Sequence, residues 1–145
     1  MFRRILVPTD LTERSLRALD AAEKMCVHDV VHVTLLHVIE TIEDSEFEEF
    51  ESFYNSLKRR AQKKMEDMVK EYSGERMTVI REIIFGKRVR EILKYAHENR
   101  IDLIILNSRK IDPQTATQGW STISHKVSVL SHCPVLLIKE SELGL

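Results

Sequence analysis

Short apolar runs alternate along the chain with longer segments in which apolar residues recur every three or four positions. Five of the short runs are rich in aliphatic and β-branched residues and are bounded by turn-forming residues, which predicts buried strands. The predicted strands are residues 4–8, 30–39, 77–85, 102–106 and 135–138. The second is apolar on both faces from Val33 to Val38, as expected of a central strand in a parallel sheet.

The segments between the strands have the period of amphipathic helices. The predicted helices cover about residues 13–27, 47–72, 88–99 and 121–131. The second follows an acidic stretch and has a single apolar stripe. That stripe consists of Phe47, Phe50, Tyr54, Leu57, Ala61, Met65, Met68 and Tyr72. Its acidic residues come first and its basic residues later, an order that complements the helix dipole.

Regular alternation of strands and helices predicts an α/β fold with an open parallel sheet and helices on both faces. The length of 145 residues suits one domain, residues 1–145, with a substantial buried core. In such sheets, ligands bind beyond the carboxyl ends of the strands, where the strand order reverses. The loops after the first, second and fourth strands are therefore the first places to look for a site.

Composition narrows the class of protein further. The 22 basic and 23 acidic residues give a net charge of −1, whereas a general nucleic-acid binder normally has a basic excess. No apolar run approaches the roughly 18 residues needed to span a bilayer, and the short apolar start does not resemble a secretory signal. We therefore expect no nucleic-acid partner, no membrane partner and a cytoplasmic location. Cys26 and Cys133 form no C-x-x-C pair, which favours free thiols.

Asp10 is the first candidate for ligand chemistry, because it lies two residues beyond the first strand. One interpretation is a carboxylate that accepts hydrogen bonds from a ribose or a base. The other is a residue of a helix N-cap region, alongside Thr9 and Thr12, and the pattern alone favours it because Asp is common there. No pair of residues suggests a nucleophile with its base, and no carboxylate-rich cluster accompanies the histidines. We therefore expect neither an enzyme nor a metal site.

The polar loop 107–120 is the second candidate, because irregular connections of about fourteen residues are usually functional or mobile. A helix beginning at Ser121 and Thr122 offers N–H groups and a positive dipole end to a phosphate. Arg109 and Lys110 would add positive charge. A solvated loop that ends in a hydroxyl cap is an equally good interpretation.

Taken together, these segments resemble the universal stress protein family. The residues that carry the resemblance are 4–10 (RILVPTD), 35–38 (LLHV), 102–106 (DLIIL) followed by Ser108 and Arg109, and 133–138 (CPVLLI). The resemblance covers nearly the whole chain and implies a Rossmann-like sheet, of the adenine nucleotide alpha hydrolase type, with strand order 3-2-1-4-5. It also implies a homodimer through the edge strand from Val135 to Ile138, since an uncovered apolar edge is a template for pairing.

Members of this family that bind ATP have the pattern G-x2-G-x9-G-[ST] after the fourth strand, and an Asp after the first. Asp10 matches that Asp. The first glycine position is Asn107 and the second is Lys110, and the final pair falls on Ser121 and Thr122 in a loop one residue longer. All three glycines are replaced and only the hydroxyl of Thr122 is retained, which implies that ATP binding is weakened or lost.

The resemblance thus implies a nucleotide site of ten residues. They are Pro8, Thr9, Asp10, Val38, Asn107, Ser108, Arg109, Lys110, Ser121 and Thr122. The first functional interpretation is a non-enzymatic, homodimeric stress-response module that binds partners, or a ligand other than ATP. The second is a nucleotide sensor with ATP or AMP as its cofactor. The third is a slow ATPase or a self-phosphorylating protein, which ranks last because no base that would activate water is visible.

Overall fold

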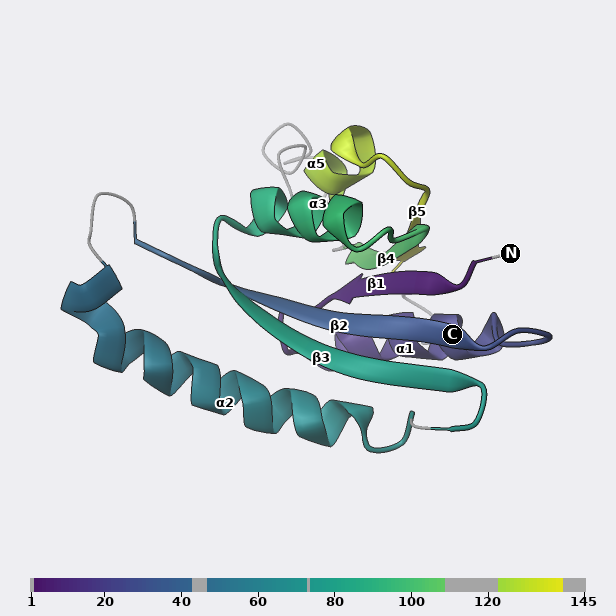
Figure 1. Ribbon diagram of the computed structural model, residues 1–145, viewed down its shortest axis with the longest axis horizontal. Helices are drawn as coiled ribbons and strands as arrows, with labels where there is room; N and C mark the ends of the chain where they lie inside the picture. Colours follow the sequence, from purple (N-terminus) through teal and green to yellow (C-terminus); the bar gives the residue numbers. More distant parts are fainter. Residues whose placement is uncertain (1, 43–46, 73, 109–122, 140–145) are drawn as a thin grey trace.

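Five strands form one parallel sheet in the order β3-β2-β1-β4-β5 (Figure 1). The computed structural model describes residues 2–42, 47–72, 74–108 and 123–139. The strands are β1 (Arg4–Pro8), β2 (Val31–Glu40), β3 (Met77–Gly86), β4 (Leu103–Ser108) and β5 (Val135–Lys139). The predicted α/β class and strand order are confirmed.

The helices cover both faces of this sheet. They are α1 (Arg14–Lys24), α2 (Glu51–Val69), α3 (Arg88–Glu98) and α5 (Ile123–Leu130), and a short 3-10 helix, η1 (Phe47–Phe50), precedes α2. The single helix predicted over residues 47–72 is therefore two elements, because the backbone of Phe50 leaves the helical region at φ −118° and ψ 17°. No helix among the described segments is long and apolar enough to cross a membrane.

The first helix is shorter than the predicted range 13–27. The N–H groups of Met25 and Cys26 donate to the carbonyls of Ala22 and Glu23, three residues back. Such bonds tighten the last turn into a 3-10 geometry, and the helix ends at Lys24.

Alternate residues of the strands contribute to two separate cores, as the two-residue period of a strand requires. Ile5 and Val7 of β1 pack with α1 and α2 on one face, whereas Leu6 packs with α3 and α5 on the other. Figure 1 shows the same division, with α3 and α5 on the opposite side of the sheet from α1 and α2. Both faces of the central strands are buried, which explains their continuous apolar sequence.

Candidate functional site

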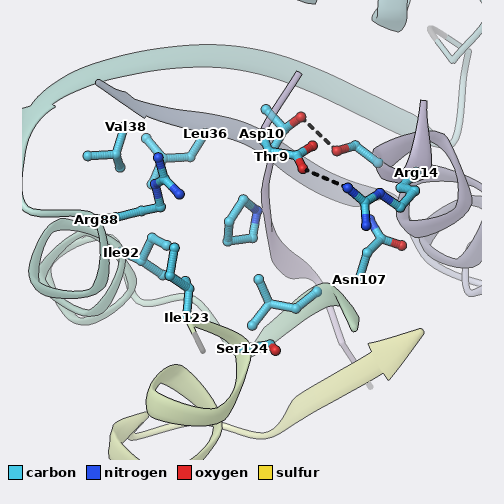
Figure 2. A pocket seen from close by; sticks show the side chains of 13 residues that line it. Thr9, Asp10, Arg14, Leu36, Val38, Arg88, Ile92, Asn107, Ile123 and Ser124 are labelled. Carbon is cyan, nitrogen blue, oxygen red and sulfur yellow. Dashed lines mark hydrogen bonds and ion pairs between the residues drawn. The ribbon is translucent and has the colours of Figure 1, made fainter. Parts of the chain in front are cut away.

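A pocket of about 290 Å³ lies at the carboxyl ends of β1, β2 and β4, on the face covered by α3 and α5 (Figure 2). Its apolar wall is formed by Pro8, Leu36, Val38, Ile92, Leu106 and Ile123. Its polar groups come from Thr9, Asp10, Arg14, Ser15, Arg88, Asn107 and Ser124. The pocket has the position expected for a ligand site in an open parallel sheet, where the strand order reverses.

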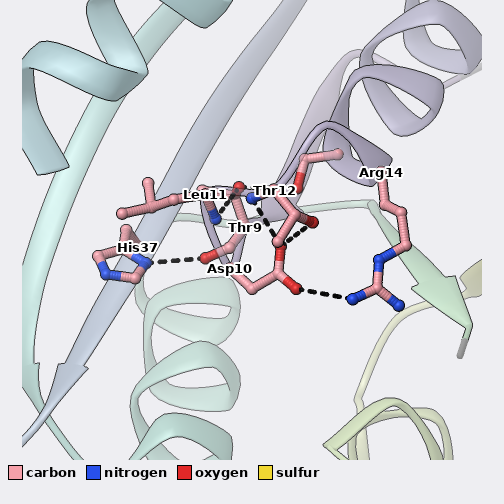
Figure 3. Close-up of polar contacts among 7 residues, drawn as sticks. Thr9, Asp10, Leu11, Thr12, Arg14 and His37 are labelled. Atoms are coloured by element: carbon pink, nitrogen blue, oxygen red, sulfur yellow. Dashed lines mark hydrogen bonds and ion pairs between the residues drawn. The ribbon is translucent and has the colours of Figure 1, made fainter.

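The turn after β1 is fixed by hydrogen bonds that begin at Thr9 (Figure 3). The N–H of Thr9 donates to the Leu36 carbonyl at 2.8 Å. Its buried Oγ1 lies 2.7 Å from Ser15 Oγ and accepts the Leu11 N–H at 2.9 Å. These bonds hold Leu11 at a φ of 68°, in the left-handed region that costs a side-chain-bearing residue about 1–2 kcal/mol. The turn thereby sets the position of Asp10.

Asp10 is held by its own neighbours. Its Oδ1 accepts hydrogen bonds from the Thr12 N–H at 3.0 Å and the Thr12 hydroxyl at 2.5 Å, and its Oδ2 lies 3.7 Å from the Arg14 guanidinium. Burial raises the pKa of Asp10, but these hydrogen bonds and the charge of Arg14 outweigh it and hold the pKa below its ordinary value. The carboxylate is therefore ionised, and with about four acceptor sites it has capacity left for a ligand.

The sequence pattern favoured a capping role for Asp10, and the structure corrects this. The N-cap residue of α1 is Glu13, whose side chain forms no capping hydrogen bond. The carboxylate of Asp10 instead bonds within its own turn, two residues on, which is a common alternative for Asp side chains. Thr9 and Thr12, also predicted to cap the helix, form bonds inside the same turn. An Asp side chain can bond either within its own turn or to the first N–H groups of the helix, and the residue types alone do not show which of the two it does.

Two arginines that the sequence analysis did not select line opposite sides of the pocket (Figure 2). Arg14 lies beside Asp10 and Asn107, whereas Arg88 lies beside Val38 and Ile92. Arg14 is four residues after Asp10, and this spacing was the one signal in the sequence for an ion pair between them. Arg88 begins α3, directly after β3, and the loop after this strand was not among the first places expected to form a site.

Arg88 differs from Arg14 in its partners. Its backbone N–H donates to Glu40 Oε1 at 3.4 Å, but its guanidinium forms no ion pair with any residue that the structure describes. Among the described residues that line the pocket, Arg14 is therefore neutralised by Asp10, whereas Arg88 is available to an anionic ligand.

His37 of β2 supports the turn from its other side (Figure 3). Its Nδ1 lies 2.9 Å from the Thr9 carbonyl oxygen, so Nδ1–H is the donor. Burial and the nearby charge of Arg88 lower the pKa of His37, and together they outweigh the Thr9 carbonyl and Asp10, which raise it. His37 is therefore neutral near pH 7 and serves as a fixed donor to the turn.

Five of the ten residues predicted for the nucleotide site line this pocket: Pro8, Thr9, Asp10, Val38 and Asn107. Ser108 ends β4 as a buried residue and is not among the residues that line the pocket. The other four lie outside the described residues: Arg109, Lys110, Ser121 and Thr122. Their roles stay predictions, as does the assignment of the whole set to a nucleotide.

Two further predictions concern metals and thiols. Within the described parts of the chain, no group of three or more His, Cys, Asp or Glu side chains is placed to hold a metal ion. Both Cys26 and Cys133 are free and half-buried, as the sequence predicted.

The sequence model of the universal stress protein family matches residues 1–139. The universal stress protein YxiE of Bacillus subtilis is 32% identical over 151 aligned positions, which span 96% of this chain and all of that relative. The universal stress protein MJ0577 of Methanocaldococcus jannaschii is 30% identical, over 96% of each chain.

Solved structures of similar proteins superpose on nearly the whole chain. The structure of MJ0577 superposes with a TM-score of 0.79, covering 98% of this chain and 99% of that one. A universal stress protein family member from Arabidopsis thaliana, solved with AMP bound, superposes with a TM-score of 0.68 at 19% identity. That likeness covers 97% of this chain and 93% of the other, and at such identity it concerns the fold alone.

Proposed function

We propose that this chain, which belongs to the universal stress protein family, is a non-enzymatic binding module whose pocket holds a small anionic nucleotide. AMP is the ligand that best fits the proposal, and ATP is bound only weakly. The observation that carries it is the placement of an ionised Asp10 and of Arg88, an arginine with no ion pair to any described residue, on opposite sides of one pocket.

Each wall of the pocket suits one part of a mononucleotide. The apolar residues Val38, Ile92 and Ile123 offer a surface on which a base can bury its faces. The carboxylate of Asp10 is suited to accept hydrogen bonds from ribose hydroxyls, and the guanidinium of Arg88 to bind a phosphate through paired N–H donors. The Arabidopsis relative with AMP bound supports a ligand of this class.

The residue at the first glycine position of the family pattern is the reason to expect weak ATP binding. Asn107 occupies that position and lines the pocket, so a side chain takes up space where ATP-binding members have none. A glycine lets a phosphate approach the backbone closely, and any side chain obstructs that approach. A triphosphate therefore gains less here than a monophosphate, which needs only one cationic group.

Trp120 provides a direct test, because it is the only tryptophan in the chain and belongs to the predicted ligand loop. AMP should change its emission in a saturable way, and Asp10→Asn should weaken the response because it removes the charge of the carboxylate. Asp67→Asn is the matched control, because it makes the same change at an exposed carboxylate of α2, on the other face of the sheet. A response to AMP that is equal in wild type and Asp10→Asn would contradict the assignment of Asp10.

The alternative is a sensor that binds ATP as tightly as AMP, and the family membership itself favours it. Micromolar ATP binding with a conformational response would establish that function in place of the one proposed.

The absence of enzymatic activity is tested separately, by incubating the protein with ATP and Mg²⁺. Release of phosphate above the buffer rate, or labelling of the protein from radioactive ATP, would contradict it.

We also propose that the functional unit is a homodimer joined through β5. This strand is at the edge of the described sheet, and Val135, Leu136, Leu137 and Ile138 are all half-buried apolar residues. An apolar edge strand is a template for pairing with another chain. Light scattering at micromolar concentration should give the mass of a dimer, and a monomer would contradict this part of the proposal. A cytoplasmic location stays a prediction.

A further inference from the structure

A second hollow, shallow and open to solvent, is lined by residues of α3 and α5 and by Glu40 at the end of β2. Its apolar part is formed by Val89 and Leu93 of α3 together with Leu130 of α5. Val89 and Leu93 are four residues apart, so they present one row along the helix. Leu130, the last residue of α5, is 63% exposed. The hollow is therefore a groove with an apolar strip that is only partly covered.

Basic side chains surround this apolar strip. Lys87, Arg88 and Arg90 contribute from the start of α3, and Lys126 from α5, whereas Glu40 is the one carboxylate that lines the groove. Lys87, Arg90 and Lys126 are exposed at the surface. In a chain with a net charge of −1, this is a local excess of positive charge around an apolar surface.

We propose that this groove binds an acidic amphipathic helix of a partner protein. An amphipathic helix places its apolar face in such a groove and leaves its charged residues at the rim, where the exposed Arg90 and Lys126 would meet carboxylates. Complementary charges of this kind accelerate association and suppress wrong partners. The proposal does not rest on nucleotide binding, although Arg88 lines both the groove and the pocket.

Two other anionic partners fit the groove less well. A nucleic acid presents its phosphates to basic residues but has no aliphatic face for Val89, Leu93 and Leu130. An anionic membrane is bound by apolar residues that project from the surface, whereas these three line a hollow. The apolar strip therefore favours a peptide, and the concave shape favours a helix over a membrane.

The test uses the full-length protein and a fluorescently labelled synthetic helix of about 15 residues, long enough to be helical on binding. Its sequence places Leu at helical spacing and Glu on the remaining face, and a second peptide has the same composition in scrambled order. Fluorescence anisotropy at low salt should show saturable binding of the first peptide and much weaker binding of the second. Binding should weaken as salt is added, because the rim charges are exposed.

Two pairs of variants locate the binding surface. Leu130→Asp and Arg90→Glu change residues of the groove, and each should weaken peptide binding roughly tenfold or more. Val129→Asp and Lys94→Glu are the matched controls, because Val129 is 67% exposed beside Leu130 and Lys94 is exposed on α3 outside the groove. Both controls should bind like wild type. Circular dichroism verifies that all four variants remain folded.

Several outcomes would overturn the proposal. No binding of the helical peptide, equal binding of the scrambled peptide, or equal losses in groove and control variants would each do so. The proposal would also be overturned if the peptide did not bind and a single-stranded oligonucleotide or phosphatidylserine vesicles did, with binding that Leu130→Asp and Arg90→Glu abolish.

Discussion

The two faces of the sheet are built from the same strands but are covered differently. One face is covered by α1 and by the 19-residue α2, and side chains such as Leu19 and Met65 are completely buried there. The other is covered by α3 and α5, of 11 and 8 residues, and among the described residues it has both the pocket and the groove. Under the proposed function, one face serves stability and the other combines stability with binding.

Truncation of a core residue on each face should separate these roles, with the largest effects that we expect. Leu19→Ala and Ile92→Ala each remove a side chain that is at most 1% exposed, so each should lower the free energy of unfolding by about 2–5 kcal/mol. Only Ile92 also lines the pocket. Urea denaturation should therefore show similar losses of stability for the two variants. AMP titration under native conditions should show weaker binding for Ile92→Ala alone. Equal effects on AMP binding would contradict the division between the faces.

Removal of the charge of Arg88 should affect ligand binding more than stability. A hydrogen bond to a charged group contributes about 1.5–3 kcal/mol, so Arg88→Gln should weaken AMP binding roughly ten- to a hundredfold. Arg90→Gln is the control, because Arg90 lies two residues on and does not line the pocket. Calorimetric titration measures both. Similar affinities for the two variants would show that Arg88 does not bind the phosphate.

The turn beneath Asp10 should be sensitive to loss of a single hydroxyl. Thr9→Val leaves the buried Ser15 hydroxyl and the Leu11 N–H without their partner, which should cost about 1–3 kcal/mol in thermal or urea unfolding. Thr12→Val removes a hydroxyl that is exposed, and its effect on stability should be smaller. The reverse order would mean that Thr9 does not hold the turn.

The smallest effect that we expect is on pH dependence, through His37. Its pKa is below the ordinary 6.5 in the folded state, so the unfolded chain takes up a proton first as the pH falls. This contribution to stability is complete above about pH 6.5 and is lost as the pH falls towards the lowered pKa. Asp10 has a lowered pKa as well, but its contribution is lost only in stronger acid.

Unfolding measurements between about pH 8 and pH 5 test this prediction. The stability of wild type should decrease more over that range than that of His37→Gln, which does not titrate there. An NMR titration of the His37 imidazole should have its midpoint below pH 6.5. A midpoint above this value, or identical pH profiles for the two proteins, would contradict the assignment.

The sequence predicted more of the fold than of the site. Strand positions and strand order followed from apolar runs and from the family resemblance, because burial on both faces leaves a continuous apolar pattern. Asp10 was identified by its position after β1. Its actual partners were not, because turn and cap geometries use the same residue types. The break at Phe50 was hidden by an apolar stripe that continues through it.

Arg88 was missed for a different physical reason. An arginine in the first turn of a helix usually faces solvent, and only the packing of α3 against β2 brings this one into the pocket with Val38 and Ile92. Such a three-dimensional placement leaves no periodic signal in the sequence. The same applies to the groove, whose cations come from the start of α3 and from α5, two elements that are not consecutive along the chain.

The most direct test of the proposed function is a calorimetric titration of AMP and of ATP into the wild-type protein under the same conditions. We predict that AMP binds and that ATP binds roughly tenfold more weakly or not at all, because only one described cation is available for phosphate. Micromolar binding of ATP, as tight as that of AMP or tighter, would contradict it.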